Sequence, residues 1–204
     1  MEQVRAIVAG VDVGGPRKGF DVAVLRGTTV RLHRTTDPTE VAATVADAEL
    51  VGVDAPAAWA PAGQASRPDE RAFARAGICG IRYTPDEAAA RARTDGYLDW
   101  VWQGLALYGA LADAGIPTVE VFPTAAWTRW CGARGGHTRL AWAREGLRRL
   151  RAAGLGDDAG GRPSQDAMDA IAAALVSRQA MAGTVVRFGA LTVPAAGSWP
   201  ALSS

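Results

Sequence analysis

The first quarter of the chain consists of short apolar, β-branched runs separated by turn residues, a pattern typical of buried strands. The first run ends at Asp12 and a Gly-Gly pair, and the fourth ends at Asp54. Because only short turns separate the first three runs, they predict an antiparallel meander. A short helix is expected from Pro38 to about Ala48, with Asp37 as its N-cap. The predicted strands are residues 4–13, 20–26, 29–34 and 49–54.

Helical periodicity dominates after residue 94. Apolar side chains recur there at steps of three and four residues, which predicts amphipathic helices. A short run, PTVEVF, predicts a fifth strand at 117–122 with Glu120 inside it. A Gly/Asp loop is expected at 154–162, and the tail at 184–204 is expected to add one or two short edge strands. The predicted helices cover residues 95–114, 137–153 and 163–181.

The segment 55–94 interrupts this regular pattern. It is rich in Pro, Gly and Ser, carries six arginines, and predicts one helix at about 68–75. An irregular stretch of this length inside a regular core is typical of a functional loop, so we expect a lid. The whole chain, 1–204, is then one α/β domain, with a mixed five-stranded sheet that begins with three antiparallel strands and continues with parallel ones.

Composition narrows the class of protein. The 204 residues are 49% hydrophobic and 21% charged, which fits a globular domain and argues against disorder along the chain. No apolar run reaches the roughly 18–20 residues of a membrane span, and the N-terminus lacks the pattern of a signal peptide, so we expect a cytoplasmic protein. The two cysteines, Cys79 and Cys131, exclude a disulfide framework and a CxxC zinc site. Oligomeric state is left open.

The basic residues are almost all arginine. Lys18 is the single lysine among 22 basic residues, so a cluster of arginines is weaker evidence for phosphate binding here than in a lysine-rich chain. The formal net charge of +1 does not by itself indicate a nucleic-acid-binding protein, although nucleic acid stays a candidate partner. The arginines of 129–151 are interpreted as a solvated helix face. The tryptophans near them, Trp127, Trp130 and Trp142, are interpreted as packing side chains and not as side chains that stack on bases.

Acidic residues stand in three of the predicted strands and in the last helix. An acid in a buried apolar strand costs several kcal/mol unless it is paired. Each could be a strand-end cap or an arginine partner, but the set is explained more simply by convergence on a shared cation. Oxygen-only clusters suit Mg²⁺ or Mn²⁺, and two such ions about 4 Å apart can activate a water against a phosphodiester. The set comprises Asp12, Asp54, Glu120, Asp166 and Asp169.

The order of elements and the positions of these acids resemble the ribonuclease H-like fold. More narrowly, the sequence resembles the family called "domain of unknown function 429", usually described as predicted ribonuclease H-like nucleases. The resemblance spans about residues 7–181 and rests on the order and spacing of five short motifs. They are GVDVGG, VGVDAP, SRPDERAFARAG, VEVFPTAAW and DAMDAIAAAL.

The resemblance implies roles for individual residues. Asp12, Asp54 and Asp169 would be metal ligands, and Glu120 and Asp166 would be ligands or would support them. The segment after the fourth strand resembles a recurrent Arg/Asp motif of the family that reaches the substrate or orients the carboxylates. The sequence departs from the family where two adjacent acids and a lysine are often found. The residues of the Arg/Asp motif are Arg67, Asp69 and Arg71. One departure is Gln165, which precedes Asp166 where the family often has a second acid. The other is Arg139, which stands in place of the lysine and can hold phosphate.

Three functions follow from this sequence. The leading one is a divalent-metal-dependent nuclease that hydrolyses DNA or RNA with its carboxylate cluster. The second is a catalytically degenerate module of the same fold that binds nucleic acid or a protein partner. The third is phosphoryl transfer of the sugar-kinase or ATPase type, which the length of the chain disfavours because such enzymes use two domains of this kind.

Overall fold

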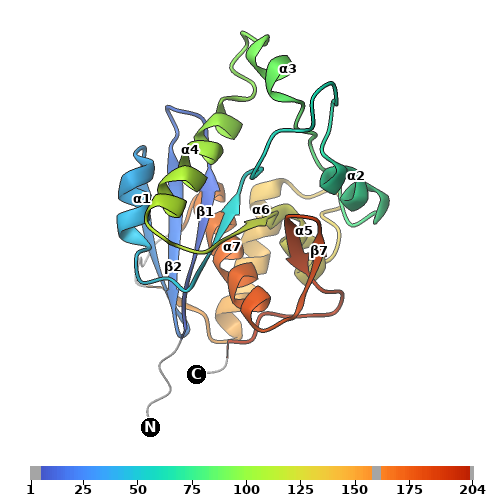
Figure 1. Ribbon diagram of the computed structural model, residues 1–204. Helices are drawn as coiled ribbons and strands as arrows, with labels where there is room; N and C mark the ends of the chain where they lie inside the picture. Colours follow the sequence, from blue (N-terminus) through green and yellow to red (C-terminus); the bar gives the residue numbers. More distant parts are fainter. Residues whose placement is uncertain (1–5, 158–161, 203–204) are drawn as a thin grey trace.

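Eight strands form one mixed sheet in the computed structural model, which describes residues 6–157 and 162–202 (Figure 1). Their spatial order is β6-β3-β2-β1-β4-β5-β8-β7. Residues 4 and 5 of the first predicted strand, and residues 158–161 of the predicted Gly/Asp loop, lie outside the described residues. The strands are β1 (Ile7–Val13), β2 (Phe20–Arg26), β3 (Thr29–Thr35), β4 (Leu50–Asp54), β5 (Thr118–Val121), β6 (Gly156–Asp157), β7 (Val185–Phe188) and β8 (Leu191–Pro194).

The central five strands confirm the predicted arrangement. Strands β1, β2 and β3 pair antiparallel, and β4 and then β5 continue the sheet parallel to β1, as expected of a ribonuclease H-like fold. The predicted count of five strands for the sheet is too low, but the expectation that the tail adds one or two short strands is confirmed. The tail supplies β8, parallel to β5, and β7, antiparallel to β8, and the two residues of β6 extend the opposite edge beside β3. These additions lengthen the sheet without changing its centre.

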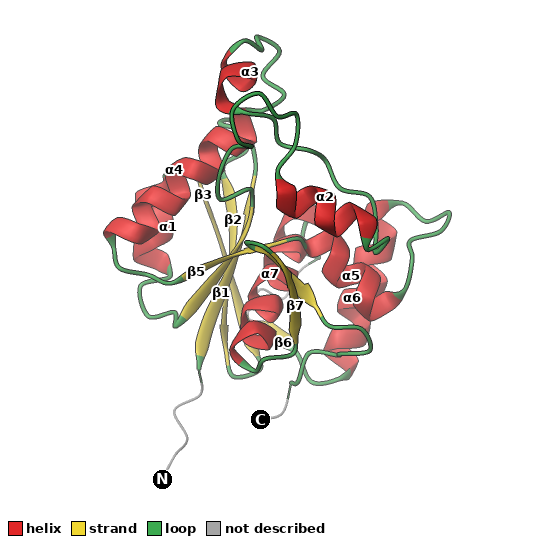
Figure 2. Cartoon of the chain, turned by 45° about the vertical axis from the view of Figure 1, so that its right-hand side comes forward, coloured by secondary structure: helices red, strands yellow, loops and turns green. Residues whose placement is uncertain are grey.

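Helices cover both faces of the sheet (Figure 2). One face carries α1 and α4, which pack with β1, β2 and β4, and the other carries α5, α6 and α7. Two of the helices in the described residues, α3 and α5, were not predicted. No helix in this part of the chain combines the length and hydropathy needed to cross a membrane. The helices are α1 (Pro38–Thr44), α2 (Pro68–Arg75), α3 (Glu87–Arg91), α4 (Asp99–Asp113), α5 (Pro123–Cys131), α6 (Arg139–Ala152) and α7 (Gln165–Met181).

Three tryptophans of α5 and α6 pack in the hydrophobic core. Trp127 is 1% exposed, and Trp130 and Trp142 are also buried, so the prediction that they pack in the core is confirmed. Trp127 and Trp130 meet edge to face, with ring centroids 5.5 Å apart. This cluster places α5 and α6 beside α7.

Two glycines allow α7 to lie directly on the sheet. Gly10 of β1 and Gly52 of β4 are neighbours in the parallel register. A Cβ on Gly10 would overlap the α7 backbone at Ala170, Ala173 and Ala174, and a Cβ on Gly52 would lie 2.7 Å from the carbonyl oxygen of Ala173. The absence of side chains at both positions therefore sets how closely α7 approaches the two central strands.

We expect Gly10→Ala to destabilise the protein by about 1–3 kcal/mol or more, because the backbone of α7 must move away from β1. The matched control is Gly109→Ala in α4, where an added methyl group meets nothing within 4 Å and where the exposed helix gains up to about 1 kcal/mol. Urea unfolding of the two variants measures both effects. Equal stabilities would contradict the close packing of α7 on the sheet.

Candidate functional site

Three aspartates form one row across the central strands. In the sheet register, Asp12 of β1 lies opposite Asp21 of β2 on one side and Asp54 of β4 on the other. The row lies two residues beyond Gly10 and Gly52, so its side chains share the face that α7 covers. Sequence reasoning missed Asp21. The sequence did contain an indication of its position. In an antiparallel hairpin the start of the second strand lies opposite the end of the first, so Asp21 is expected near Asp12.

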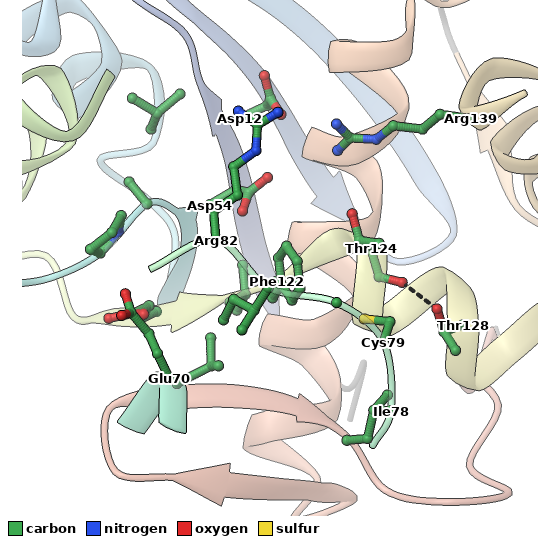
Figure 3. Close-up of a pocket in the computed structure, with 18 of the residues that line it drawn as sticks. Asp12, Asp54, Glu70, Ile78, Cys79, Arg82, Phe122, Thr124, Thr128 and Arg139 are labelled. Atoms are coloured by element: carbon green, nitrogen blue, oxygen red, sulfur yellow. Dashed lines mark hydrogen bonds between the residues drawn. The ribbon is translucent and has the colours of Figure 1, made fainter. Parts of the chain in front are cut away.

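The first turn of α7 brings a fourth aspartate to this row. Carboxylate oxygens of Asp12, Asp21 and Asp166 lie within 4.8 Å of one another. Of the predicted site residues, Asp12, Asp54, Asp166 and Asp169 are brought together at this end of the sheet. The charges of Asp54, Asp169 and Asp166 raise the pKa of Asp12, and the charges of Asp169 and, from β5, Glu120 raise the pKa of Asp54. Figure 3 shows Asp12 and Asp54 on neighbouring strands with the Arg139 guanidinium pointing toward them from the side.

Asp169 is fully buried and held by three donors. Trp127 donates through Nε1 to Oδ1 at 2.9 Å, and Oδ2 accepts from Arg139 at 2.8 Å and from Gln165 at 2.9 Å. Arg139 and Gln165 therefore act on the same carboxylate, which they hold in one orientation.

Burial and mutual repulsion disfavour ionisation of the cluster. Burial raises the pKa of Asp12 well above its usual range, and the charges of Asp54, Asp169 and Asp166 raise it further. Burial, with contributions from the charges of Asp169 and Glu120, raises the pKa of Asp54 to about 8, although the Arg139 charge and a hydrogen bond with Asp12 offset part of the rise. Burial also raises the pKa of Asp21 and Asp169. A group of acids in this state is stabilised by protons or by a bound cation.

The only lysine of the chain lies at this cluster. Lys18 Nζ is 2.6 Å from Oδ2 of Asp166, with the lysine side chain half exposed. The tight turn between β1 and β2 directs it there, since the backbone of residues 14–19 closes on itself and Gly14 leaves room for the lysine stem. A Cβ on Gly14 would lie 2.8 Å from Cβ and Cδ of Lys18. The turn thus places one mobile positive charge beside the acids.

Glu120 lies apart from the row. It pairs in register with Val53, whose side chain packs with α1 and α4, whereas its neighbours Val119 and Val121 pack with α7. Its carboxylate therefore leaves β5 on the opposite face from Asp12 and Asp54. Both of its oxygens accept from Arg67, and Oε2 also accepts from the Ala57 amide.

Arg67 links two buried acids. Its guanidinium binds Glu120 at one end and Glu70 at the other, and all three residues are at most 5% exposed. Glu70 Oε2 in turn accepts from the backbone amides of Arg67 and Thr84. The network fastens the start and the end of the segment 55–94 to β5, and it uses the lone pairs that a metal ion would need from Glu120.

The other two residues of the Arg/Asp motif bind backbone and side chains of the protein itself. Asp69 accepts from the Ala190 amide at 2.9 Å, which holds the turn between β7 and β8 against α2. Arg71 donates to Ser66 and to Gln64 within the segment that precedes α2. The structure thus places Arg67, Asp69 and Arg71 in contacts that anchor the inserted segment.

A cavity of about 860 Å³ opens over the acids. Its lining includes the acids Asp12, Asp54 and Asp166 and, besides the ion-paired Arg67, four further cations. Figure 3 shows Asp12, Asp54, Arg82 and Arg139 of this set. This volume lies within the range of roughly 300–1,000 Å³ that is typical of small-molecule sites. The cations are Lys18, Arg82, Arg134 and Arg139.

Comparisons with known proteins match one family and several solved structures, among them two of the same protein. No curated protein matches the chain. A structure of Thermus thermophilus RuvC is 18% identical, with a TM-score of 0.45, over 87% of this chain and 97% of that one. T. thermophilus RuvC in complex with a Holliday junction substrate is 20% identical, with a TM-score of 0.47, over 88% and 97%. The family described as "Protein of unknown function (DUF429)" matches residues 10–192, so the chain belongs to this family.

Proposed function

We propose that the protein is a divalent-metal-dependent nuclease that hydrolyses a phosphodiester bond of DNA or RNA in the cavity over the aspartate row. One observation carries the proposal: four strand and helix ends deliver acids to one place, where their ionisation is disfavoured. Groups with strongly perturbed pKa values in a cleft are typical of functional sites. A packed core alone gives no reason to gather them.

The donor set fits a hard divalent cation. Asp12, Asp21 and Asp166 offer only oxygen atoms, and these lie close enough to one another to bind one ion. In this proposal they hold Mg²⁺ or Mn²⁺, with Asp54 and Asp169 adjoining them. The bound ion would supply charge neutralisation at the phosphate and would lower the pKa of a water molecule.

The surrounding residues orient the acids and the phosphate. Arg139 holds Asp169 and presents its remaining donors to the cavity, where an arginine suits a phosphate oxygen. Lys18 balances the charge of Asp166 and is free to turn toward a phosphate because its side chain is half exposed. Arg82 and Arg134 of the lining add the positive charge that a nucleic-acid strand requires.

We assign Glu120, Arg67, Asp69 and Arg71 to a different task. Their contacts hold the segment 55–94 and the β7–β8 turn in place, and this segment supplies the wall of the cavity opposite the acids. In this proposal they shape the site and do not bind the metal.

Metal binding provides the first test. At a hundredfold excess over its Kd, Mn²⁺ should stabilise the wild-type protein by about 2.7 kcal/mol, or raise Tm by roughly 5–10 °C, and Asp12→Asn should abolish this rise. Glu120→Gln is the contrasting variant. Its unfolding free energy should fall by about 1–3 kcal/mol, because a buried Arg67 donor loses a carboxylate acceptor while Glu70 still balances the charge, yet it should keep the metal-dependent rise. Thermal unfolding with and without Mn²⁺ measures both.

The same proteins test the chemistry. Wild-type protein with Mn²⁺ should cleave at least one of a panel of single-stranded, duplex and branched DNA and RNA, and Asp12→Asn should cleave none. Metal binding without cleavage would favour the degenerate binding module. Absence of both, or a metal-dependent rise that survives in Asp12→Asn, would refute the proposal.

The pH dependence of stability tests the electrostatics of the metal-free site. The pKa of Asp54 is about 8 in the folded protein and near 3.8 when unfolded, so between these values the folded state binds the extra proton. Stability therefore falls as pH rises through this window, by at most about 1.4 kcal/mol per pH unit for one proton. Urea unfolding in EDTA from pH 5 to 8 should show this fall weakened in Asp54→Asn but not in Asp47→Asn, which changes an exposed acid. Parallel profiles of all three proteins would contradict the assignment.

A Lys18 variant tests whether the lysine competes with the metal ion for Asp166. Removing its charge in Lys18→Met leaves Asp166 to the metal alone, so Mn²⁺ should bind roughly 2- to 5-fold more tightly, the range expected for a partly exposed ion pair. Isothermal titration calorimetry measures the Kd, with Arg26→Met, a change far from the acids in an exposed ion pair, as control. Weaker Mn²⁺ binding in Lys18→Met would show that the lysine supports the metal site instead of competing with it.

A further inference from the structure

The cavity has two unlike halves, and the proposed hydrolysis uses only one of them. The half described above carries the acids and the cations. Apart from Arg67, Glu70 and Glu120, which are paired with one another, the other half is lined by apolar and weakly polar side chains from three separate parts of the chain. These are Ile78, Cys79, Ile81, Val121, Phe122 and Leu191.

The inserted segment closes this second half. Ile78, Cys79 and Ile81 lie in the stretch between α2 and α3, where they are partly buried and pack against a small core around Phe73 and Leu191. Figure 3 shows Phe122 between Asp54 and the strand of chain that carries Ile78 and Cys79. This half is therefore a largely apolar, partly enclosed part of the cavity next to the acids.

Charge and shape together restrict what fits. An occupant that spans both halves must carry negative charge toward Lys18 and Arg139 and a flat apolar body toward Phe122. Hydroxyl groups are also available beside that body. Thr124 and Thr128 line the same wall, and the Thr128 hydroxyl donates to the Thr124 carbonyl, which leaves its oxygen able to accept.

We propose that the apolar half is a binding site for one unstacked nucleobase, the base attached to the phosphate that the acids attack. This inference rests on the proposed nuclease function and adds the substrate class. A base inside a continuous duplex cannot enter a pocket of this kind unless it leaves the stack, which costs a few kcal/mol and costs least in single strands. The substrate is therefore a single strand or a locally unpaired site. Stacking on Phe122 serves any base, because every base has a π-face.

Cys79 offers a direct probe of occupancy in the wild-type protein. Its thiol lines the apolar half, whereas Cys131, the other thiol, lies at the end of α5 near Gly146 and outside the cavity lining. Burial raises the pKa of both thiols, so alkylation with iodoacetamide is followed at about pH 8.5 by mass spectrometry. A saturating single-stranded oligothymidylate, with EDTA present to prevent cleavage, should slow alkylation of Cys79 at least roughly fivefold and leave Cys131 unchanged.

Two further ligands separate base from phosphate and single strand from duplex. An abasic oligonucleotide of the same length should give little protection of Cys79, and a blunt duplex should protect it less than the single strand does. Equal protection by the abasic strand would overturn the proposal, because phosphate alone would then account for occupancy. Absence of protection by any of these ligands would overturn it as well.

A pair of variants tests the pocket by affinity. Ile81→Glu places a carboxylate in the apolar half and should weaken binding of the single strand at least roughly fivefold in fluorescence anisotropy, without changing the Kd for Mn²⁺. Tyr83→Glu adds the same charge two residues along, on a side chain that is 50% exposed and outside the cavity lining, and should have a smaller effect. Equal losses in both variants would contradict the base site.

The two proposals fail in different ways. Base-dependent protection of Cys79 without metal binding or cleavage would keep the nucleobase site and reject the nuclease. Cleavage without base-dependent protection would keep the nuclease and reject the nucleobase site.

Discussion

Close contact between α7 and the two central strands determines where every acid of the site lies. Gly10 and Gly52 leave no side chain between the sheet and the helix, and this sets the distance of α7 from the strands. Ser177 of α7 donates to the Ala9 carbonyl, and this bond fixes the position of the helix along the strands. Asp12 and Asp54 follow the glycines by two residues and emerge just where the helix begins. A methyl group at either glycine would lift α7 and separate its acids from those of the strands.

The cost of this arrangement is electrostatic. Several carboxyl groups share one partly enclosed space, and their pKa values rise because each ionised form is desolvated and repelled by the others. The protein offsets part of the cost locally. Asp169 has three donors and Asp166 has Lys18, whereas the charges of Lys18 and Arg139 only partly offset the raised pKa values of Asp12 and Asp54. The residues with the least compensation are those that a cation would stabilise most.

Sequence patterns predicted the strands and the longer helices because burial imposes a period on them, and they predicted which strand ends carry acids. They did not predict α5, although Pro123 in its first turn and the spacing of Trp127 and Trp130 were usable signals. They also missed Asp21, whose role depends on the register of β1 with β2, a property of the pair that neither strand shows alone. The predicted role of Trp127 in packing was confirmed, but its hydrogen bond to Asp169 depends on a contact across 42 positions.

Glu120 shows why the role of an acid in a buried strand cannot be predicted from the strand alone. The sequence around it alternates valine and glutamate, and this alternation by itself places the carboxylate on the face away from its neighbours. Which face holds the site is set by α7, far along the chain, so the strand cannot reveal whether the acid belongs to it. On the far face Glu120 meets Arg67 and anchors the inserted segment. The same ion pair thereby positions the wall of the cavity that we assign to the base, so the acid of β5 shapes the cavity by holding the inserted segment in place.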